Sequence, residues 1–132
     1  TPLAAAVRNG DVASVALLLE AGANPNLRSN GIPPLHFAAP LYRFAESETL
    51  DYQAAAKRYL AIIDLLLAHG AVLDAEAELN NVTFLNQCIL RGHEEIAAHL
   101  VNAGASTDKK DKRGKSPLDY AEALHLTIGD CR

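Results

Sequence analysis

The chain has 132 residues, of which 49% are hydrophobic, enough for one domain with a continuous core. Its formal net charge of −4 argues against a general nucleic-acid binder, because such a protein needs a basic surface. No apolar run reaches the roughly 18 residues of a membrane-spanning helix, and two cysteines are too few for a disulfide framework. We therefore expect neither nucleic acid nor a membrane as its partner.

Residues 1–28 predict two short helices joined by a turn. Pro2 suits the first turn of a helix, whose N–H groups have no partner, and Thr1 is a candidate N-cap. Gly10 ends this helix, and Gly22 ends the second, where a left-handed residue is favoured. The apolar residues of the second helix recur at helical spacing: Val12, Val15, Leu18 and Leu19. Neither helix can bury its apolar stripe alone, so the pair must stack on a neighbour.

The next unit starts in the same way and then departs from the pattern. Asn30-Gly31 supply the positive-φ turn of a hairpin tip, and a helix begins at Pro34. Pro40 falls inside that helix at a cost of roughly 3 kcal/mol, so the helix should stop near Ala39 or kink. From Pro34 to Gly70 there are 36 residues where the first unit has 20, an insertion of 16.

The second half of this unit predicts one helix of about 18 residues, from Asp51 to Ala68. Its apolar positions lie along one face: Ala55, Tyr59, Ile62, Ile63 and Leu66. Thr49 is a candidate cap for this helix, and residues 41–48 are a connecting loop.

Residues 78–105 return to the regular pattern. A helix starts after Thr83, Gly92-His93 form the turn, and a second helix ends at Gly104. Asn80-Asn81 occupy the tip of the preceding loop, where Asn tolerates the left-handed backbone. Ser116-Pro117 open a further helix, but residues 126–132 are too few for its partner. The last unit is therefore expected to be a half-repeat that caps the array.

These units recur with a period near 33 residues, since Phe84 and Pro117 hold the same place 33 residues apart. The recurring motifs are Thr1-Pro2-Leu3, Pro34-Leu35-His36, Thr83-Phe84-Leu85 and Ser116-Pro117-Leu118. The first three lead to Gly-Ala at residues 22–23, 70–71 and 104–105. Over nearly the whole chain, these residues resemble ankyrin repeats.

The resemblance implies an all-α ankyrin-repeat solenoid of helix–turn–helix units with β-hairpin-like finger loops. One domain would span residues 1–132. It would hold three repeats at about 1–28, 29–77 (with the insertion) and 78–110, and a terminal half-repeat at 111–132.

The resemblance also implies a non-enzymatic protein–protein interaction module, because partners of this family contact the fingers and the exposed inner-helix positions. Carried over position by position, this binding stripe contains Arg8, Asn9, Ser29, Asn30, Ile32, Leu41, Leu79, Asn80, Val82, Leu90, Arg91, Lys112, Arg113 and Lys115. Its four apolar finger and helix residues, Ile32, Leu79, Val82 and Leu90, would form an apolar centre beside the basic finger. Alternatively, they pack between neighbouring fingers.

The insertion offers a second candidate surface. Tyr42 and Phe44 have no place in the repeat pattern, and connections beyond about 12–15 residues are usually functional or disordered. Their aromatic character argues against disorder, so both join the candidate partner-binding residues. The rival function is a dedicated inhibitor or immunity-type protein that blocks one enzyme or toxin with residues 40–52. The plainer alternative is that this loop folds back over the long helix.

The residues that could carry chemistry form no catalytic or metal-binding pattern. The resemblance implies that His36 bonds the backbone of a finger, and Cys88 holds a small inward position of the core. Glu95 and His99 lie four residues apart on one helix, but a metal site needs at least a third ligand. A metal- or thiol-dependent enzyme would need that ligand or an exposed Cys88 of low pKa. We expect no enzyme, no cofactor and no metal.

The expected partner is a protein that the sequence does not identify, bound by a monomer. Adjacent fingers should attract each other, because Asp74, Glu76 and Glu78 face a net charge of +3 over residues 108–115. The chain lacks a first Met and begins inside a repeat, so we expect a processed or trimmed product. The cytoplasm is slightly favoured, with a secreted or periplasmic location open if a signal peptide was removed.

Overall fold

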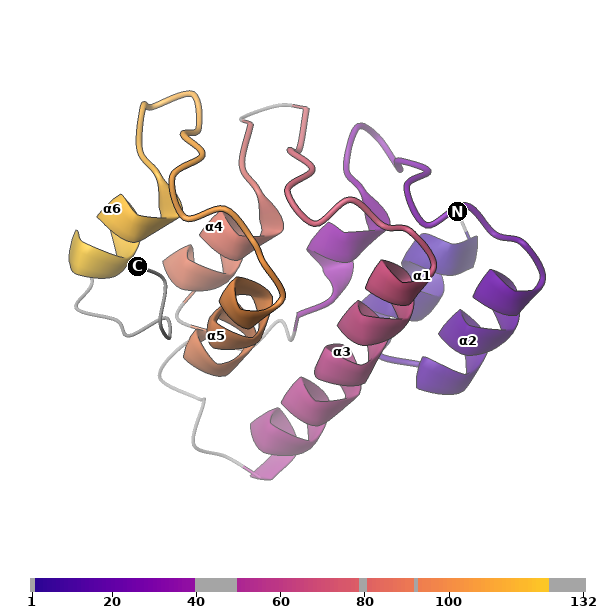
Figure 1. Ribbon diagram of the computed structural model, residues 1–132. Coiled ribbons are helices and arrows are strands. Elements are labelled where there is room, and N and C mark those ends of the chain that lie inside the picture. Colours follow the sequence, from indigo (N-terminus) through magenta and orange to yellow (C-terminus); the bar gives the residue numbers. More distant parts are fainter. Residues whose placement is uncertain (1, 40–49, 79–80, 92, 124–132) are drawn as a thin grey trace.

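The protein is an array of short helices stacked in two rows (Figure 1), and its computed structural model describes residues 2–39, 50–78, 81–91 and 93–123. The inner row contains α1 (Pro2–Arg8), the 3₁₀ helix η1 (Pro34–Phe37), α4 (Phe84–Leu90) and α6 (Pro117–Ala123). The outer row contains α2 (Val12–Glu20), α3 (Leu50–Ala68) and α5 (Glu94–Asn102). Neighbours pack along each row and between the rows. The predicted all-α solenoid is confirmed.

Three loops, here called finger 1 (residues 21–33), finger 2 (69–83) and finger 3 (103–116), project from one edge of the array (Figure 1). Among the described residues they contain isolated bridges, Ser29 with Ile32 and Glu76 with Thr83, and no extended strand. Asn30 and Gly31 have φ angles of 53° and 80°, as the two-residue hairpin turn requires. Asn81 also has a positive φ, 56°, so the predicted finger tips are confirmed there.

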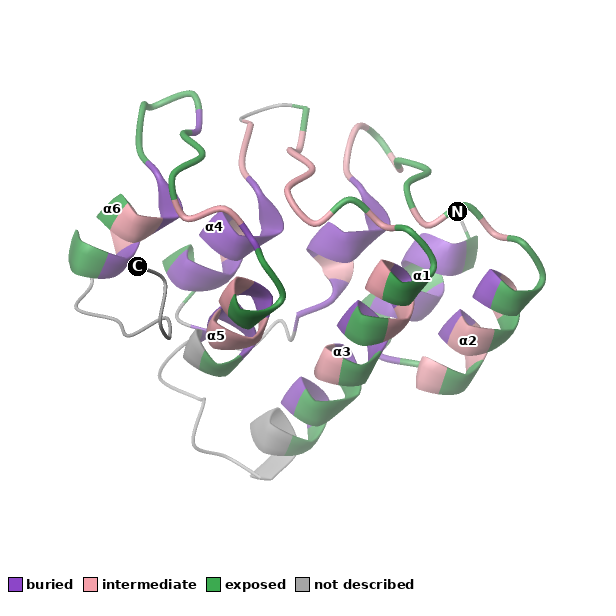
Figure 2. Ribbon diagram, viewed as in Figure 1, coloured by how far each residue is buried: buried purple, intermediate pink, exposed green. Residues whose placement is uncertain are grey.

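The apolar core runs without interruption from α1 to α6 between the two rows (Figure 2). Its largest fully buried apolar side chains come from both rows: Val7, Val15, Leu35, Ile62, Ile63, Leu66, Phe84, Leu85, Ile89, Ile96 and Leu100. Burying each contributes about 1.5–3 kcal/mol relative to exposure. The predicted apolar face of the long helix is among the buried residues, including Tyr59 at 6% exposed.

The second unit departs from the others where Pro40 predicted it would. Its inner helix is reduced to the four residues of η1, and Ala38 has already left the helical region, with φ −87° and ψ 49°. The residue before a proline is disfavoured in the α region, so the helix cannot continue through Ala39. The outer helix α3 has 19 residues against nine in α2 and extends well past its neighbours (Figure 1). Thr49 and the insertion loop lie outside the described residues.

The helix ends carry the caps that the sequence predicts. The Thr83 side chain accepts a hydrogen bond from the Asn86 N–H at 3.2 Å. Ser116 and Asp119 form a reciprocal pair, each side chain accepting from the other's N–H, at 3.2 and 2.9 Å. Gly104 has φ 103° after α5, in the left-handed region that a C-cap uses. Thr1 and the end of the predicted terminal cap, residues 124–132, lie outside the described residues.

Candidate functional site

Two adjoining hollows lie where fingers 1 and 2 meet the inner row. The larger hollow, about 350 Å³, is lined by Asn30, Ile32, Ala77, Val82, Gln87, Leu90 and Arg91. The smaller hollow, about 230 Å³, is lined by Arg8, Ile32, His36, Phe37, Ala39, Gln87 and Arg91. Because they share Ile32, Gln87 and Arg91, they form one depression, here called the two-part groove.

Six residues of the predicted stripe line this groove: Arg8, Asn30, Ile32, Val82, Leu90 and Arg91. They come from α1, finger 1, finger 2 and the end of α4, so only the stacking of three units brings them together. The exposed Leu90 is 47% accessible, whereas Ile32 and Val82 are half-buried. Ile32 and Val82 are thus partly covered by their neighbours, and all three side chains line an open surface.

The other predicted stripe residues lie elsewhere. Asn9 is exposed and Ser29 is half-buried in the turn of finger 1, and neither lines the groove. The three basic residues of finger 3, Lys112, Arg113 and Lys115, are exposed on a finger that lines neither hollow. The remaining candidates lie outside the described residues: Leu41, Tyr42, Phe44, Leu79 and Asn80.

Hydrogen bonds between the second and third units fix the floor of the groove. The Gln87 Nε2 donates to the His36 carbonyl at 2.8 Å, and the His36 Nε2 lies 2.8 Å from the Val82 carbonyl of finger 2. Burial lowers the pKa of His36, and the bond to Val82 opposes this only in part. The ring is therefore neutral at pH 7, with the Nε2–H as donor. The predicted bond from His36 to a finger backbone is confirmed.

Arg8 is held in place at the other end of the groove. The Tyr59 hydroxyl of α3 donates to the Arg8 carbonyl at 2.6 Å, which fixes the end of α1. The Arg8 Cζ lies 4.5 Å from the centroid of the Phe37 ring, within cation–π distance. A guanidinium positioned in this way loses little conformational freedom when it binds a further group.

Sequence reasoning missed Phe37 and Gln87. Both occupy the position after the third residue of the recurring Pro-Leu-His motif, where the other two copies have Ala5 and Tyr120. Phe37 and Tyr120 are only partly buried against the core, so the position accepts side chains of very different size, and that variation is the signal that could have identified it. Because it faces the groove in two adjacent units, it also shapes the surface.

The groove has a uniform charge. Among the described residues, Arg8 and Arg91 are the only charged ones that line it, and no described Asp or Glu lines either hollow. Within the described ranges, the ion pairs join His99 to Asp64 and Lys109 to Glu76, so neither arginine belongs to one. This surface is basic although the chain as a whole has a net charge of −4.

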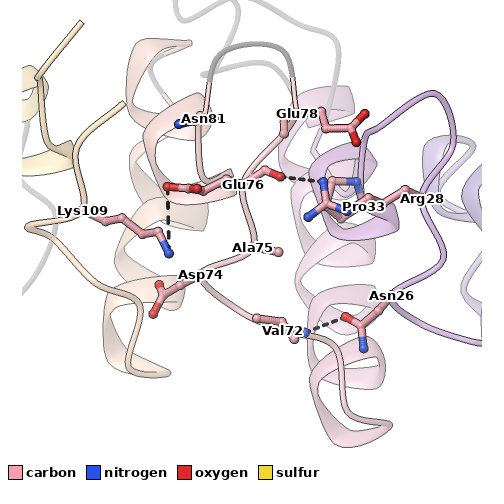
Figure 3. A pocket seen from close by; sticks show the side chains of 11 residues that line it. Asn26, Arg28, Pro33, Val72, Asp74, Ala75, Glu76, Glu78, Asn81 and Lys109 are labelled. Carbon is pink, nitrogen blue, oxygen red and sulfur yellow. Dashed lines mark hydrogen bonds and ion pairs between the residues drawn. The ribbon is translucent and has the colours of Figure 1, made fainter. Parts of the chain in front are cut away.

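A third hollow of about 570 Å³ lies between the fingers and has mixed charge (Figure 3). The Arg28 Nη1 donates to the carbonyls of Gly31 and Glu76, at 2.9 and 2.6 Å, and so ties finger 1 to finger 2. The Lys109 Nζ lies 3.9 Å from the Glu76 Oε2, which realises the predicted attraction between fingers 2 and 3. These contacts join the three fingers into one ridge.

The residues considered for chemistry are accounted for by packing. Cys88 is fully buried, and burial raises the pKa of its thiol, so it is a core residue without thiolate character. The His99 Nε2 lies 2.7 Å from the Asp64 Oδ1, a contact between α5 and α3 that sequence reasoning did not foresee. No cluster of three metal-ligating side chains occurs in the described part of the chain, and no described helix could span a bilayer.

Comparison with known proteins relates the chain to one repeat family. The family model described as Ankyrin repeat matches residues 1–30. Protein PhlB of Serratia liquefaciens is 33% identical over 119 residues, which cover 89% of this chain and 45% of that protein. The human transient receptor potential cation channel subfamily A member 1 is 30% identical over 92% of this chain and 10% of its own length. Human Arf-GAP with coiled-coil, ANK repeat and PH domain-containing protein 2 is 33% identical over 61% of this chain. The chain thus spans less than half of the length of these relatives.

Proposed function

Because this chain belongs to the ankyrin repeat family, we propose that it binds a protein partner in the two-part groove. Ankyrin repeats are in general modules of protein–protein interaction, and one such scaffold serves many partners. The observation that carries the proposal is the convergence of six stripe residues on one depression. The module acts as a monomer and without catalysis, by shape and charge complementarity.

The composition of the groove supports this role. Ile32, Val82 and Leu90 supply an apolar centre, and Arg8 and Arg91 flank it. Protein interfaces combine a core depleted of charge with arginine and aromatic contacts, and arginine is enriched among the residues whose truncation costs most affinity. The basic residues of finger 3 would form an outer rim, where charge speeds association more than it strengthens the complex.

The hydrogen bonds beneath the groove also favour binding. Gln87 is fixed by the His36 carbonyl and the end of α1 by Tyr59, so the surface exists before a partner arrives. Association otherwise has to order each flexible side chain, at about 0.5–1.5 kcal/mol apiece. A preformed groove avoids part of that cost.

The test compares capture of native partners by the wild-type chain and by Leu90→Asp, which places a charge in the apolar centre. Leu90 is the last residue of α4 and 47% exposed, so the substitution should leave the fold intact, as circular dichroism can check. We expect Leu90→Asp to lose the captured protein. The control, Lys57→Glu, changes an exposed residue of α3 outside the groove and should retain it.

Retention of every captured protein by Leu90→Asp would contradict the proposal. The rival function, an inhibitor that acts through residues 40–52, predicts the opposite result for Leu90→Asp and is tested with a second variant. Replacing residues 40–49 by a short turn would then abolish capture, while Leu90→Asp would leave it unchanged.

A further inference from the structure

We infer that the two-part groove is selective for an acidic segment of the partner, with a carboxylate seated between Arg8 and Arg91. An apolar side chain close to that carboxylate in sequence would occupy the adjoining hollow beside Ile32, Val82 and Leu90. This inference rests on the proposed function and adds the chemistry of the partner to it.

The charge of the groove favours an acidic ligand. Arg8 and Arg91 line the same 230 Å³ hollow, and no carboxylate of the described residues lines it with them. The hollow between the fingers differs, because Arg28 and Lys109 share it with Asp74, Glu76 and Glu78. Of these hollows, as lined by the described residues, the two-part groove therefore presents positive charge without a counter-charge, in a chain whose net charge is −4. A basic ligand segment would be repelled there, and a neutral one would leave the charges unused.

Arginine is well suited to binding a carboxylate. Its guanidinium binds a carboxylate through two parallel N–H···O bonds, and its weak hydration makes removal from water less costly than for lysine. The Arg8 Cζ lies over the face of the Phe37 ring, 4.5 Å from the ring centroid. The attraction between the cation and the ring helps to position Arg8 before a carboxylate arrives.

The arrangement of the two hollows adds a spacing rule. They share Ile32, Gln87 and Arg91, so groups bound in the two hollows would contact the same three side chains. An extended peptide would place an acidic and an apolar side chain there from positions two residues apart, because alternate side chains point to the same side. Arg91 contacts both hollows, and its substitution should therefore have the larger effect of the two arginines.

The experiment selects random 12-residue peptides displayed on phage against the intact chain and against Arg91→Glu. We expect the wild-type chain to enrich peptides in which Asp or Glu lies within two residues of Leu, Ile, Val or Phe. Arg91→Glu should enrich Lys or Arg at the same place instead. A synthetic peptide from the wild-type selection should bind Arg8→Gln and Arg91→Gln roughly tenfold more weakly or worse, the loss of about 1.4 kcal/mol. Lys57→Glu serves as the control and should bind as the wild type does.

The outcomes separate the two proposals. If the enriched peptides fail on Leu90→Asp but lack an acidic preference or bind Arg91→Glu unchanged, the groove binds proteins and the carboxylate site is wrong. If they bind both variants unchanged, or no peptide is enriched, the carboxylate site is overturned and its groove has no part in binding peptides. The carboxylate site is supported if the affinity of the selected peptide falls between low and high salt for the wild-type chain and does not fall for Arg91→Gln.

Discussion

His36 and Asn86 occupy the same place in adjacent units, the third residue of the inner-helix motif, and only one of them reaches its neighbour. His36 bonds the Val82 carbonyl of the next finger. Asn86 is fully buried, yet neither its Nδ2 nor its Oδ1 has a hydrogen-bond partner. A buried polar group without a partner costs about 1–3 kcal/mol. The contact between the last two units therefore lacks a bond that the preceding contact has.

Replacing Asn86 by His should stabilise the chain. The carbonyl equivalent to that of Val82 belongs to Lys115, since each precedes the capping residue of the following helix and each accepts from an N–H of its own finger. A longer imidazole would reach it, and we expect the free energy of unfolding to rise by about 1 kcal/mol. Urea titration measures the change. The reverse variant, His36→Asn, should lose about 1–3 kcal/mol; a destabilised Asn86→His would show that the site cannot hold the ring.

At the scale of elements, finger 1 lies against finger 2 at a glycine. Gly31 has φ 80°, its carbonyl accepts from the Glu78 N–H at 3.0 Å, and a Cβ placed on it would lie 2.9 Å from the Glu78 Cβ. Gly114 of finger 3 has nearly the same φ, 77°, but a Cβ there would meet nothing within 4 Å. The two glycines share a backbone requirement, and only Gly31 also needs the space.

Gly31 and Gly114 form a matched pair of sites at which the contact between the fingers can be tested. Gly114→Ala should cost about 1 kcal/mol, because alanine resists the left-handed region. Gly31→Ala should cost more, since the Cβ also pushes finger 2 away from finger 1. Amide exchange at Glu78 should then speed up in Gly31→Ala and stay unchanged in Gly114→Ala. Equal losses of stability in the two variants would mean that finger 2 moves aside freely.

Local pattern made most of the elements predictable. Pro34 and Pro40 bound a short helix, Thr83 caps a helix start, and Asn30-Gly31 form a hairpin turn, each through chemistry confined to a few residues. The features that could not be predicted depend on contacts between residues far apart in the sequence. The pair of His99 and Asp64 joins residues 35 apart, on helices whose relative rotation the sequence does not specify. Likewise, the stripe was predicted as a series of positions, and which of them share a groove depends on how three units stack.

At the scale of the whole molecule, α3 is the central helix of the outer row and connects the two ends of the array. It packs on α2 towards the N-terminus and on α5 towards the C-terminus, and Ile63 in it is 0% exposed. In an array of repeats, stability is approximately the sum of unit and neighbour terms, so a central defect affects both sides.

Ile63→Ala should therefore lower the free energy of unfolding by about 2–5 kcal/mol, the usual range for a core truncation of this kind. Leu17→Ala, at a residue 66% exposed, is the control and should change it by less than about 0.5 kcal/mol. Amide exchange in α2 and α5 reports on the coupling. If only one of them loses protection in Ile63→Ala, the ends of the array unfold independently.

The reduced helix η1 has a mechanical consequence. Whereas α4 meets a full helix in α6, it meets only the four residues of η1 on its other side, and side-chain bonds from His36, Gln87 and Arg28 add to that connection. Opening the array at this contact between the second and third units would break those side-chain bonds. The two-part groove spans the same contact, with Arg8 and Ile32 on one side and Leu90 and Arg91 on the other. A ligand bound across this contact would hold its two sides together, and the force needed to open the array would rise with the affinity of the ligand.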